Sequence, residues 1–185
     1  LEKGERVLEL GCGWGGFARF AAANYGCSVV AYNISEQQVA YARRWCAGLP
    51  VEVRLSDYRD ASGEFDKVAA IGICEHVGFK NYRTLMEVAH RTVKPHGLVL
   101  VHSIGNNASV TTGDPWFDKY IFPGGMLPSV AQLGAAMDGL FVMEDWHNFG
   151  PDYDRTLLAW QKNVDRHRGE WDSTFDERFF RMWRY

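Results

Sequence analysis

The sequence has few cysteines, no surplus of positive charge and no long uninterrupted apolar run. Its four cysteines, Cys12, Cys27, Cys46 and Cys74, are scattered along the chain, which argues against a disulfide framework and against a structural zinc site. Reduced thiols are therefore expected, as in a cytoplasmic protein. The formal net charge of -3 provides no basic field, so nucleic acid is not an expected partner. No apolar run is long enough to span a bilayer.

What is present is the composition of one globular domain. The chain has 185 residues, of which 46% are hydrophobic and 23% are charged, enough to bury a single core. No internal repeat or low-complexity linker divides it, so we expect one domain over residues 1–185. Because the sequence starts at Leu1 and stops at Tyr185 within a predicted helix, this domain is expected to be truncated at both ends.

Apolar runs of strand length alternate with helical patterns. The expected strands are residues 6–10, 28–32, 51–55, 65–73 and 98–103, and the expected helices among them are residues 15–24, 36–46 and 81–92. Ser35 is a plausible N-cap for the second of these helices, and residues 94–97 predict a turn. Strands separated by helices predict an α/β fold with a parallel sheet that is covered on both faces.

After Gly105 the pattern changes. The segments 129–137, 154–167 and 174–185 predict further helices, and residues 141–149 predict a sixth strand. Residues 114–123 are rich in aromatic side chains. Such a segment can line an apolar substrate tunnel, and it can equally be a satellite core under a loop.

The segment VLELGCGWGG, residues 7–16, predicts a buried strand that runs into a glycine turn. Gly11, Gly13 and Gly16 fit the dinucleotide-binding pattern GxGxxG. Glu9 with Gly11, Gly13 and Gly15 fits ExGxGxG, the signature of S-adenosylmethionine methyltransferases. A dinucleotide site needs an acidic residue after the second strand, and this chain has none there. The methyl donor is therefore favoured, and a tight turn without a ligand is the remaining alternative.

Asp57 and Tyr58 follow the third predicted strand, where the carboxyl ends of parallel strands meet a ligand crevice. The aspartate could accept a hydrogen bond from an adenine amino group, and the tyrosine could pack on the ring. Asp57 could equally cap a turn.

Later blocks of the chain are more specific than the glycine turn. They read GICEHVG at residues 72–78, VHSIG at 101–105, KYIFPGG at 119–125, LPS at 127–129, EDWHNFG at 144–150 and DYD at 152–154. In these blocks, and in their order, the chain resembles the cyclopropane-fatty-acyl-phospholipid synthases and is similar to their mycolic-acid cyclopropane synthase relatives. The resemblance implies a Rossmann-like class I SAM-dependent methyltransferase fold, with a mostly parallel sheet and helices on both faces.

The resemblance also implies a reaction. S-adenosyl-L-methionine would deliver its methyl group to a cis double bond of an unsaturated phospholipid acyl chain, and a bound bicarbonate would remove a proton as the cyclopropane ring closes. The catalytic positions that carry over are Glu75, His102, Tyr153 and the backbone of Ile104. The cofactor positions that carry over are Glu9, Leu10, Gly11, Cys12, Gly13, Trp14, Gly15, Asn33, Ile34, Gln38, Asp57 and Tyr58.

The resemblance further suggests a cytoplasmic enzyme, peripheral to the inner membrane, that meets its phospholipid at the membrane surface, and it suggests a homodimer. The chain departs from the family pattern in two places. Nothing in it matches the N-terminal region that precedes the family's first strand, and no segment matches the family's last strand, so the assigned function is expected of the full-length protein.

The residues by themselves leave other interpretations open. Glu75 and His76 could be solvated loop residues, His102 a core histidine, and Tyr153 a packing residue. A metal site from Cys74, His76 and His102 is conceivable, although no metal is expected. A related methyltransferase that does not close a ring, and a binding module without turnover, are the competing functions. A dehydrogenase is the least favoured.

Overall fold

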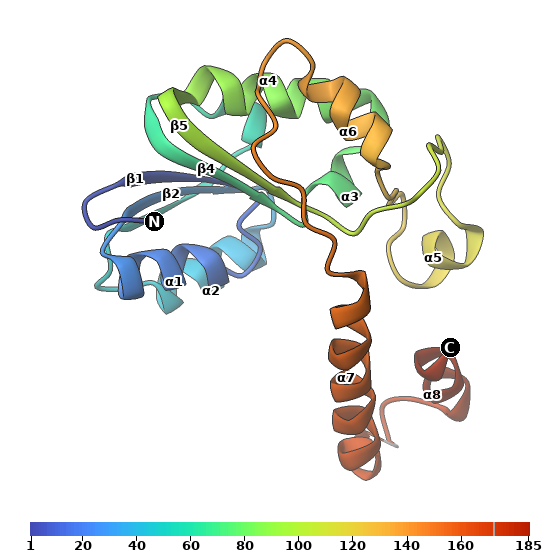
Figure 1. Ribbon diagram of the computed structural model, residues 1–185. Helices are drawn as coiled ribbons and strands as arrows, with labels where there is room; N and C mark the ends of the chain where they lie inside the picture. Colours follow the sequence, from blue (N-terminus) through green and yellow to red (C-terminus); the bar gives the residue numbers. More distant parts are fainter. Residues whose placement is uncertain (172) are drawn as a thin grey trace. The chain divides into compact units, whose positions relative to one another are not determined.

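The computed structural model describes residues 1–171 and 173–185 (Figure 1). The chain divides into two compact units, Leu1–Phe141 and Val142–Tyr185. The first unit holds the sheet and the helices packed on it, and the second holds the last two helices. The expectation of a single domain over residues 1–185 stays a prediction.

The first unit is built on a five-stranded sheet. Its strands are β1 (Arg6–Leu10), β2 (Ser28–Asn33), β3 (Val51–Leu55), β4 (Phe65–Ile71) and β5 (Val93–His102). Every neighbouring pair is parallel, in the spatial order β3-β2-β1-β4-β5, so the predicted parallel sheet is confirmed. Because the strand order reverses between β1 and β4, a ligand crevice is expected at the carboxyl ends of these two strands.

Helices lie against both faces of this sheet, as predicted. They are α1 (Gly16–Tyr25) and α2 (Glu36–Trp45) on one face, and α4 (Tyr82–Thr92) and α6 (Val130–Met137) on the other (Figure 1). Successive residues of a strand point to opposite faces, so Val7 and Leu8 of β1 enter two separate hydrophobic clusters. Both side chains are fully buried, which is why β1 is apolar on both of its faces.

Local hydrogen bonds account for where two of these helices begin. The Ser35 Oγ accepts the Gln38 N–H at 3.4 Å, so the predicted N-cap of α2 is confirmed. Ser129 and Gln132 form a capping box at the start of α6, in which each backbone N–H donates to the other side chain. Each cap satisfies backbone N–H groups that have no partner within the helix.

Short helical segments occur where no helix was predicted. They are η1 (Tyr58–Asp60), α3 (Cys74–Val77), η2 (Phe79–Asn81) and α5 (Pro115–Tyr120). The fourth strand also ends earlier than predicted, because Gly72 has a positive φ of 67° and turns the chain into α3. This turn places the α3 side chains at the carboxyl end of the sheet.

The prediction of a sixth strand over residues 141–149 is wrong. The structure has no strand in this segment, and Val142, Trp146 and Phe149 are exposed. A strand requires a neighbouring strand to hydrogen-bond with, and an apolar composition alone does not provide one.

The predicted turn at residues 94–97 is also revised, because it lies inside β5. Phe65 of β4 pairs with Val93, whereas Lys67 pairs with Leu98, so β5 bulges between these pairs. His96 has a φ of 66° at the bulge, and a left-handed backbone is a common device in bulged strands. The turn-forming residues thus shift the register without ending the strand.

The second unit contains α7 (Gly150–Trp171) and α8 (Glu177–Arg184). Helix α7 starts earlier than the predicted residues 154–167, because Pro151 is tolerated in a first helical turn. Helix α8 starts after Asp176, whose side chain accepts the Phe179 N–H at 2.9 Å. No helix in the described part of the chain is both long enough and apolar enough to cross a membrane.

The two-sided core makes a specific prediction for a pair of leucines. Leu8→Ala removes a fully buried side chain from the central strand and should lower the free energy of unfolding by about 3 kcal/mol. Leu100→Ala removes a side chain that is 54% exposed on β5 and should cost less than about 1 kcal/mol. Urea unfolding of both variants measures the difference, and equal losses would contradict this description of the core.

Candidate functional site

The glycine turn between β1 and α1 forms one wall of the crevice. Gly11 and Gly15 have φ values of 80° and 87°, which only glycine adopts readily. A Cβ on Gly11 would lie 2.9 Å from the Ile73 Cδ1, and a Cβ on Gly15 would lie 2.9 Å from the Ala42 Cβ. Both the backbone conformation and the close packing therefore require glycine at these two positions.

The structure separates the two glycine patterns that the sequence permits. Gly13, like Gly11 and Gly15, has a positive φ, whereas Gly16 does not. Gly16 is the first residue of α1, and a Cβ there would meet open space. The backbone needs the glycines of ExGxGxG and does not need the third glycine of GxGxxG, which favours a methyl-donor loop over a dinucleotide loop.

The end of β2 is tied to this turn. The Asn33 Nδ2 donates to the Gly13 carbonyl at 2.9 Å and to the Gln38 Oε1 at 2.8 Å. The Gly11 N–H donates to the Tyr32 carbonyl at 3.0 Å. The structure therefore brings the glycine turn, Asn33 and Gln38 together, as expected for parts of one site. The role of each in holding a cofactor stays a prediction.

Two further predicted cofactor residues, one in the glycine turn and one after β2, are exposed at the surface. Ile34 is 72% exposed and Trp14 is 53% exposed, and the Trp14 ring lies edge-on to Tyr41 with centroids 5.4 Å apart. In contrast, Leu10 and Cys12 are buried. Burial, followed by the nearby charge of Glu9, raises the pKa of the Cys12 thiol to about 12. The thiol is therefore neutral and unreactive at physiological pH.

Glu9 is a buried carboxylate directly beneath the glycine turn. It is 3% exposed, and its Oε2 has no hydrogen-bond partner among the described residues. Burial raises the pKa of Glu9 to about 7, against the opposing effect of a hydrogen bond from the Ala18 backbone. A nearby cation would favour the ionised form, so this group suits a positively charged ligand such as a sulfonium.

Asp57 and Tyr58 follow β3. The Asp57 carboxylate caps η1 by accepting the Arg59 N–H at 2.9 Å, so the turn-cap interpretation is confirmed. It also pairs with the Arg59 guanidinium, with an Nη2–Oδ2 distance of 2.7 Å. Tyr58 is buried in the core cluster that includes Cys74. The contacts of Asp57 and Tyr58 with an adenine ring stay predictions.

Helix α3 carries Glu75 to the crevice from the other side. Glu75 is 7% exposed, so it is not a solvated loop residue. Its Oε1 accepts the Ile104 N–H at 2.8 Å, and its Oε2 has no partner among the described residues. The structure therefore joins two of the predicted catalytic positions by a hydrogen bond.

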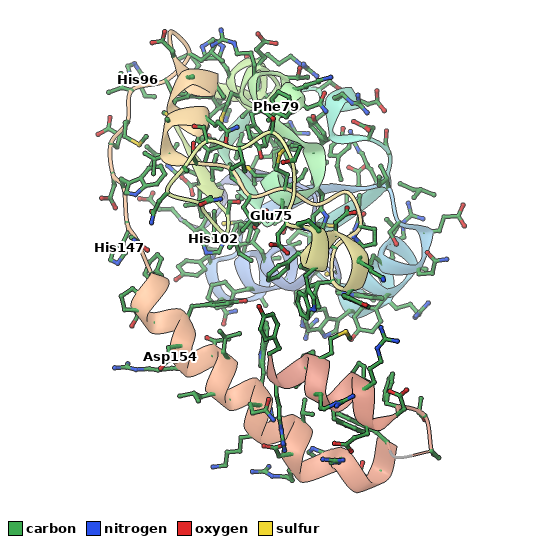
Figure 2. All side chains as sticks on the ribbon, turned by 90° about the vertical axis from the view of Figure 1, so that its right-hand side faces the viewer. Glu75, Phe79, His96, His102, His147 and Asp154 are labelled. Carbon is green, nitrogen blue, oxygen red and sulfur yellow. The ribbon has the colours of Figure 1, made fainter. Side chains whose placement is uncertain are left out.

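The other two predicted catalytic residues are placed differently. His102 ends β5, two positions before Ile104, and is exposed, so it is not a core histidine (Figure 2). Tyr153 lies in α7 of the second unit, where its ring contacts Trp160 at a centroid distance of 6.1 Å. That Tyr153 joins Glu75 and His102 stays a prediction.

A metal site from Cys74, His76 and His102 is not built. Among the described residues, no three His, Cys, Asp or Glu side chains are grouped as a metal ion would require. Cys74 is buried and His76 is exposed. The His76 ring instead lies edge-on to Phe122, with centroids 5.4 Å apart.

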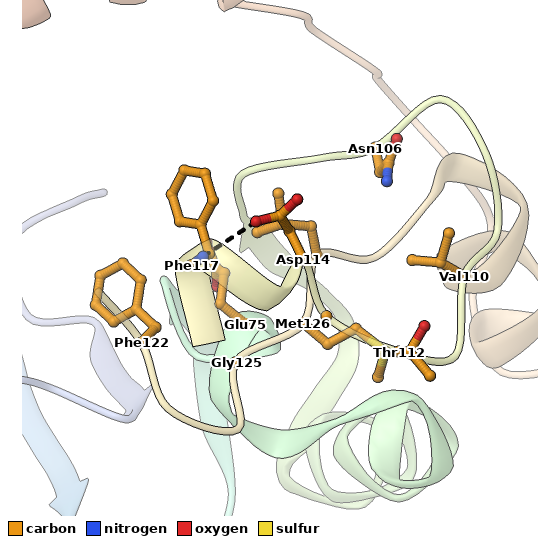
Figure 3. Close-up of a pocket in the computed structure, with 11 residues that line it drawn as sticks. Glu75, Asn106, Val110, Thr112, Asp114, Phe117, Phe122, Gly125 and Met126 are labelled. Atoms are coloured by element: carbon orange, nitrogen blue, oxygen red, sulfur yellow. Dashed lines mark hydrogen bonds between the residues drawn. The ribbon is translucent and has the colours of Figure 1, made fainter. Parts of the chain in front are cut away.

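A pocket of about 270 Å³ opens beside Glu75 (Figure 3). Its lining includes the apolar side chains of Val110, Phe117, Phe122, Met126 and Leu127, and the polar side chains of Asn106, Thr112 and Asp114. The backbone helps to form it, because the Met126 N–H donates to the Glu75 carbonyl at 2.9 Å. The aromatic segment therefore contributes two lining rings to this pocket. That the pocket takes up an acyl chain stays a prediction.

The remaining lining residues are not indicated by any periodic pattern in the sequence. Asn106, Thr112 and Met126 come from two irregular segments that meet at Gly113 and Gly125. A Cβ on Gly113 would lie 2.6 Å from the Gly125 carbonyl oxygen. This glycine pair is the signal in the sequence, but no periodic pattern reveals that the two glycines touch.

Comparison with known proteins is consistent with this geometry. A family model described as mycolic acid cyclopropane synthetase matches residues 1–185. The chain is 48% identical over 185 residues to the cyclopropane-fatty-acyl-phospholipid synthase of Escherichia coli K12, covering 100% of this chain and 48% of that protein. It is 34% identical over 199 residues to a probable fatty acid methyltransferase of Pseudomonas putida, covering 100% of this chain and 50% of that protein. The chain thus spans about half the length of the curated relatives it matches.

Solved structures establish the fold. A cyclopropane synthase of Mycobacterium tuberculosis superposes with a TM-score of 0.87 at 24% identity, over 99% of this chain and 70% of that one. A phosphoethanolamine N-methyltransferase of Haemonchus contortus superposes with a TM-score of 0.83 at 21% identity, over 99% of this chain and 44% of that one. The predicted class I methyltransferase fold is therefore confirmed.

The two adjacent glycines at the start of α1 allow a matched test of the turn. Gly15→Ala forces a Cβ into Ala42 at a positive φ and should cost about 2–4 kcal/mol in the free energy of unfolding. Gly16→Ala adds a methyl group to open space in a helix and should change it by less than about 1 kcal/mol, in the stabilising direction. Urea unfolding measures both, and equal tolerance of the two substitutions would refute the packing argument.

Glu9 should make stability depend on pH. A folded-state pKa of about 7 against 4.5 means that the folded protein holds this proton more tightly than the unfolded chain. Ionising Glu9 in the folded protein therefore lowers the free energy of unfolding. This loss is absent below about pH 4.5, grows as the pH rises, and is complete above about pH 7, where it reaches about 3 kcal/mol.

Glu9→Gln removes this dependence. Urea unfolding at pH 5 and pH 8 should show the variant gaining stability over the wild type as the pH rises. Glu64→Gln, at an exposed position, is the control and should follow the wild type. A wild-type profile parallel to that of Glu9→Gln would mean that Glu9 titrates normally.

Proposed function

This chain belongs to the mycolic acid cyclopropane synthetase family, and from that premise we propose that the protein is a SAM-dependent cyclopropane-fatty-acyl-phospholipid synthase. It transfers a methylene group from S-adenosyl-L-methionine to a cis double bond of an unsaturated phospholipid acyl chain. The observation that carries the proposal is Glu75, a buried carboxylate beside a mostly apolar pocket, with one oxygen that has no partner among the described residues. Glu75 comes two residues after Ile73, which packs against Gly11 of the glycine turn.

The residues of the glycine turn fit the cofactor. When bound, S-adenosyl-L-methionine supplies an electrophilic methyl group on a sulfonium. Gly13 leaves open space where a Cβ would stand, so a ligand can pass close to the backbone. The Glu9 carboxylate lies beneath the turn and favours a cationic ligand, and Asn33 holds the Gly13 carbonyl in place.

The pocket fits the lipid. An alkene is a weak nucleophile, so the site must hold it close to the methyl group in a productive orientation. The apolar side chains of Phe117, Phe122 and Met126 can take up an acyl chain and keep water away from positive charge that develops on it. A closed, dry pocket also directs the reaction toward loss of a proton instead of capture of water.

Ring closure requires a base for one proton of the transferred methyl group. We assign this role to a bicarbonate held by Glu75, with His102 and Tyr153 as donors to the anion. Two negative groups can lie together only if they share a proton, and the unpartnered Glu75 Oε2 is an acceptor for the bicarbonate O–H. The Ile104 N–H already donates to Glu75, so in this proposal Ile104 fixes the position of the Glu75 side chain.

The proposed partner is the unsaturated phospholipid at the membrane surface, and the proposed location is cytoplasmic and peripheral to the inner membrane. A homodimer belongs to the same set of proposals. The second candidate function is methylation of the acyl chain without ring closure, which the name of the Pseudomonas putida relative favours.

One experiment decides between these functions. The full-length protein is incubated with vesicles of unsaturated phospholipid and methyl-labelled S-adenosyl-L-methionine, with and without bicarbonate. A bicarbonate-dependent gain of one CH2 that resists hydrogenation supports cyclopropane formation. A gain in a product that hydrogenation still reduces supports methylation alone, and no label in the lipid would refute both.

Glu75→Gln tests the proposed role of the Glu75 carboxylate in the same assay. Glutamine keeps an acceptor for the Ile104 N–H but cannot share the bicarbonate proton in the same way, so turnover should fall by about 100-fold or more. Binding of S-adenosylhomocysteine should be unchanged. Glu87→Gln breaks an exposed ion pair with Arg83 and should keep wild-type turnover. Full activity of Glu75→Gln would contradict the assigned role.

A further inference from the structure

The turn that carries Asp57 is held next to the proposed cofactor site. The Ser56 N–H donates to the Asn33 carbonyl at 3.1 Å, and the Asn33 side chain donates to Gly13 of the glycine turn. Arg91 of α4 donates from its guanidinium to the carbonyls of Arg59 and Ala61. The turn is thus anchored to the cofactor side of the sheet and to the helix behind it.

Within this turn Arg59 holds the Asp57 carboxylate through both oxygens. The Arg59 Nε donates to Oδ1 at 2.8 Å and its Nη2 donates to Oδ2 at 2.7 Å. The Arg59 backbone N–H also donates to Oδ1, at 2.9 Å. A bidentate guanidinium fixes the plane of a carboxylate in a way that a single donor does not.

Counting acceptor positions shows what this pairing leaves open. An ionised carboxylate accepts about four hydrogen bonds, two on each oxygen. Oδ1 already accepts two donors from Arg59, and Oδ2 accepts one. Among the described residues, one acceptor position therefore remains without a donor, on Oδ2. The Asp57 side chain is 30% exposed, so a ligand can reach it.

We propose that Arg59 is a specificity-determining positioning residue, which presents Asp57 as a single oriented acceptor so that the site takes a base with a 6-amino group and rejects one with a 6-oxo group. The inference rests on the proposed function, because it assumes that the nucleoside of the methyl donor lies beside Asp57. It adds a role for a side chain that the resemblance does not assign.

The ion pair between Asp57 and Arg59 affects both side chains. Arg59 keeps the pKa of Asp57 below its usual range, chiefly through the side-chain hydrogen bonds, so the carboxylate stays an acceptor under mildly acidic conditions. Asp57 in turn occupies two of the five guanidinium N–H donors of Arg59, one on Nε and one on Nη2, so these two are not open to a ligand carbonyl oxygen. A ligand carbonyl placed at Oδ2 would meet an unpaired acceptor, which costs binding energy because neither group can donate.

The test measures selectivity in the full-length protein. The probes are S-adenosylhomocysteine and its deaminated 6-oxo counterpart, S-inosylhomocysteine, and calorimetry gives the dissociation constant of each. The wild type should favour the amino ligand by roughly 10- to 100-fold. Arg59→Ala should lower that ratio by about tenfold, and Arg59→Lys, which keeps the charge without the bidentate fork, should lie between them.

Glu52→Gln is the matched control. Glu52 forms a bidentate pair with Arg54 at the same spacing of two residues, but on β3, so this substitution should leave the ratio unchanged. The partial recovery of the ratio in Arg59→Lys adds a readout that a merely structural role would not move, because it follows the geometry of the guanidinium and not the folding of the turn.

The outcomes separate this inference from the proposed function. If Arg59→Ala binds both ligands with the same selectivity ratio as the wild type, the role of Arg59 is overturned and the proposed function stands. No binding of S-adenosylhomocysteine to the wild type would overturn the proposed cofactor and this inference with it. A reduced ratio in Arg59→Ala, with Glu52→Gln unchanged, is the supporting result.

Discussion

The close packing of the glycine turn is the constraint on which the site depends. Gly11 lies against Ile73 and Gly15 lies against Ala42, both at distances that leave no room for a Cβ. These contacts join the end of β1 to the α3 side of the crevice and to α2. Because protein interiors transmit small displacements, a Cβ at Gly11 would displace Ile73 before α3, and a Cβ at Gly15 would displace α2 at Ala42.

Within that frame the crevice holds two buried carboxylates of a similar kind. Glu9 at the end of β1 and Glu75 after β4 each keep one oxygen without a partner among the described residues. Burying an unpaired polar atom costs stability, so each such group calls for an explanation, such as a catalytic role or a bound ion, ligand or water. In the proposed function, a sulfonium partners Glu9 and the proton of a bicarbonate partners Glu75. The two reactants are proposed to lie between the glycine turn and the apolar pocket.

The sequence predicts most of this fold because its signals are local. The strands of β1 to β4, the Ser35 cap and the glycine turn each follow from short-range patterns that tertiary contacts reinforce. The predicted sixth strand is wrong because pairing is a property of two segments, and residues 141–149 contain only one of them. The turn at residues 94–97 was recognised from its residues, but only the pairing of β4 with β5 shows that it is a bulge.

The residues of the site were predictable where short local blocks indicate them, but the contacts between those residues were not. Glu75 and Ile104 were named through family blocks, but the hydrogen bond between them depends on how α3 leaves β4. The lining residues Asn106 and Met126 depend on the contact of two irregular segments, which no periodicity encodes. Asp57 could not be assigned a single role from the sequence. An aspartate that caps a turn and an aspartate that presents an acceptor to a ligand look the same there, and one residue can do both.

The most direct test of the central claim follows the hydrogens of the transferred methyl group. The full-length protein would be supplied with S-adenosyl-L-methionine carrying a fully deuterated methyl group, and the lipid product would be analysed by NMR spectroscopy and mass spectrometry. Ring closure by the proposed mechanism would give a ring methylene that retains two deuterons, because a base removes the third. A product that carries the intact trideuterated methyl group on an open chain would contradict it.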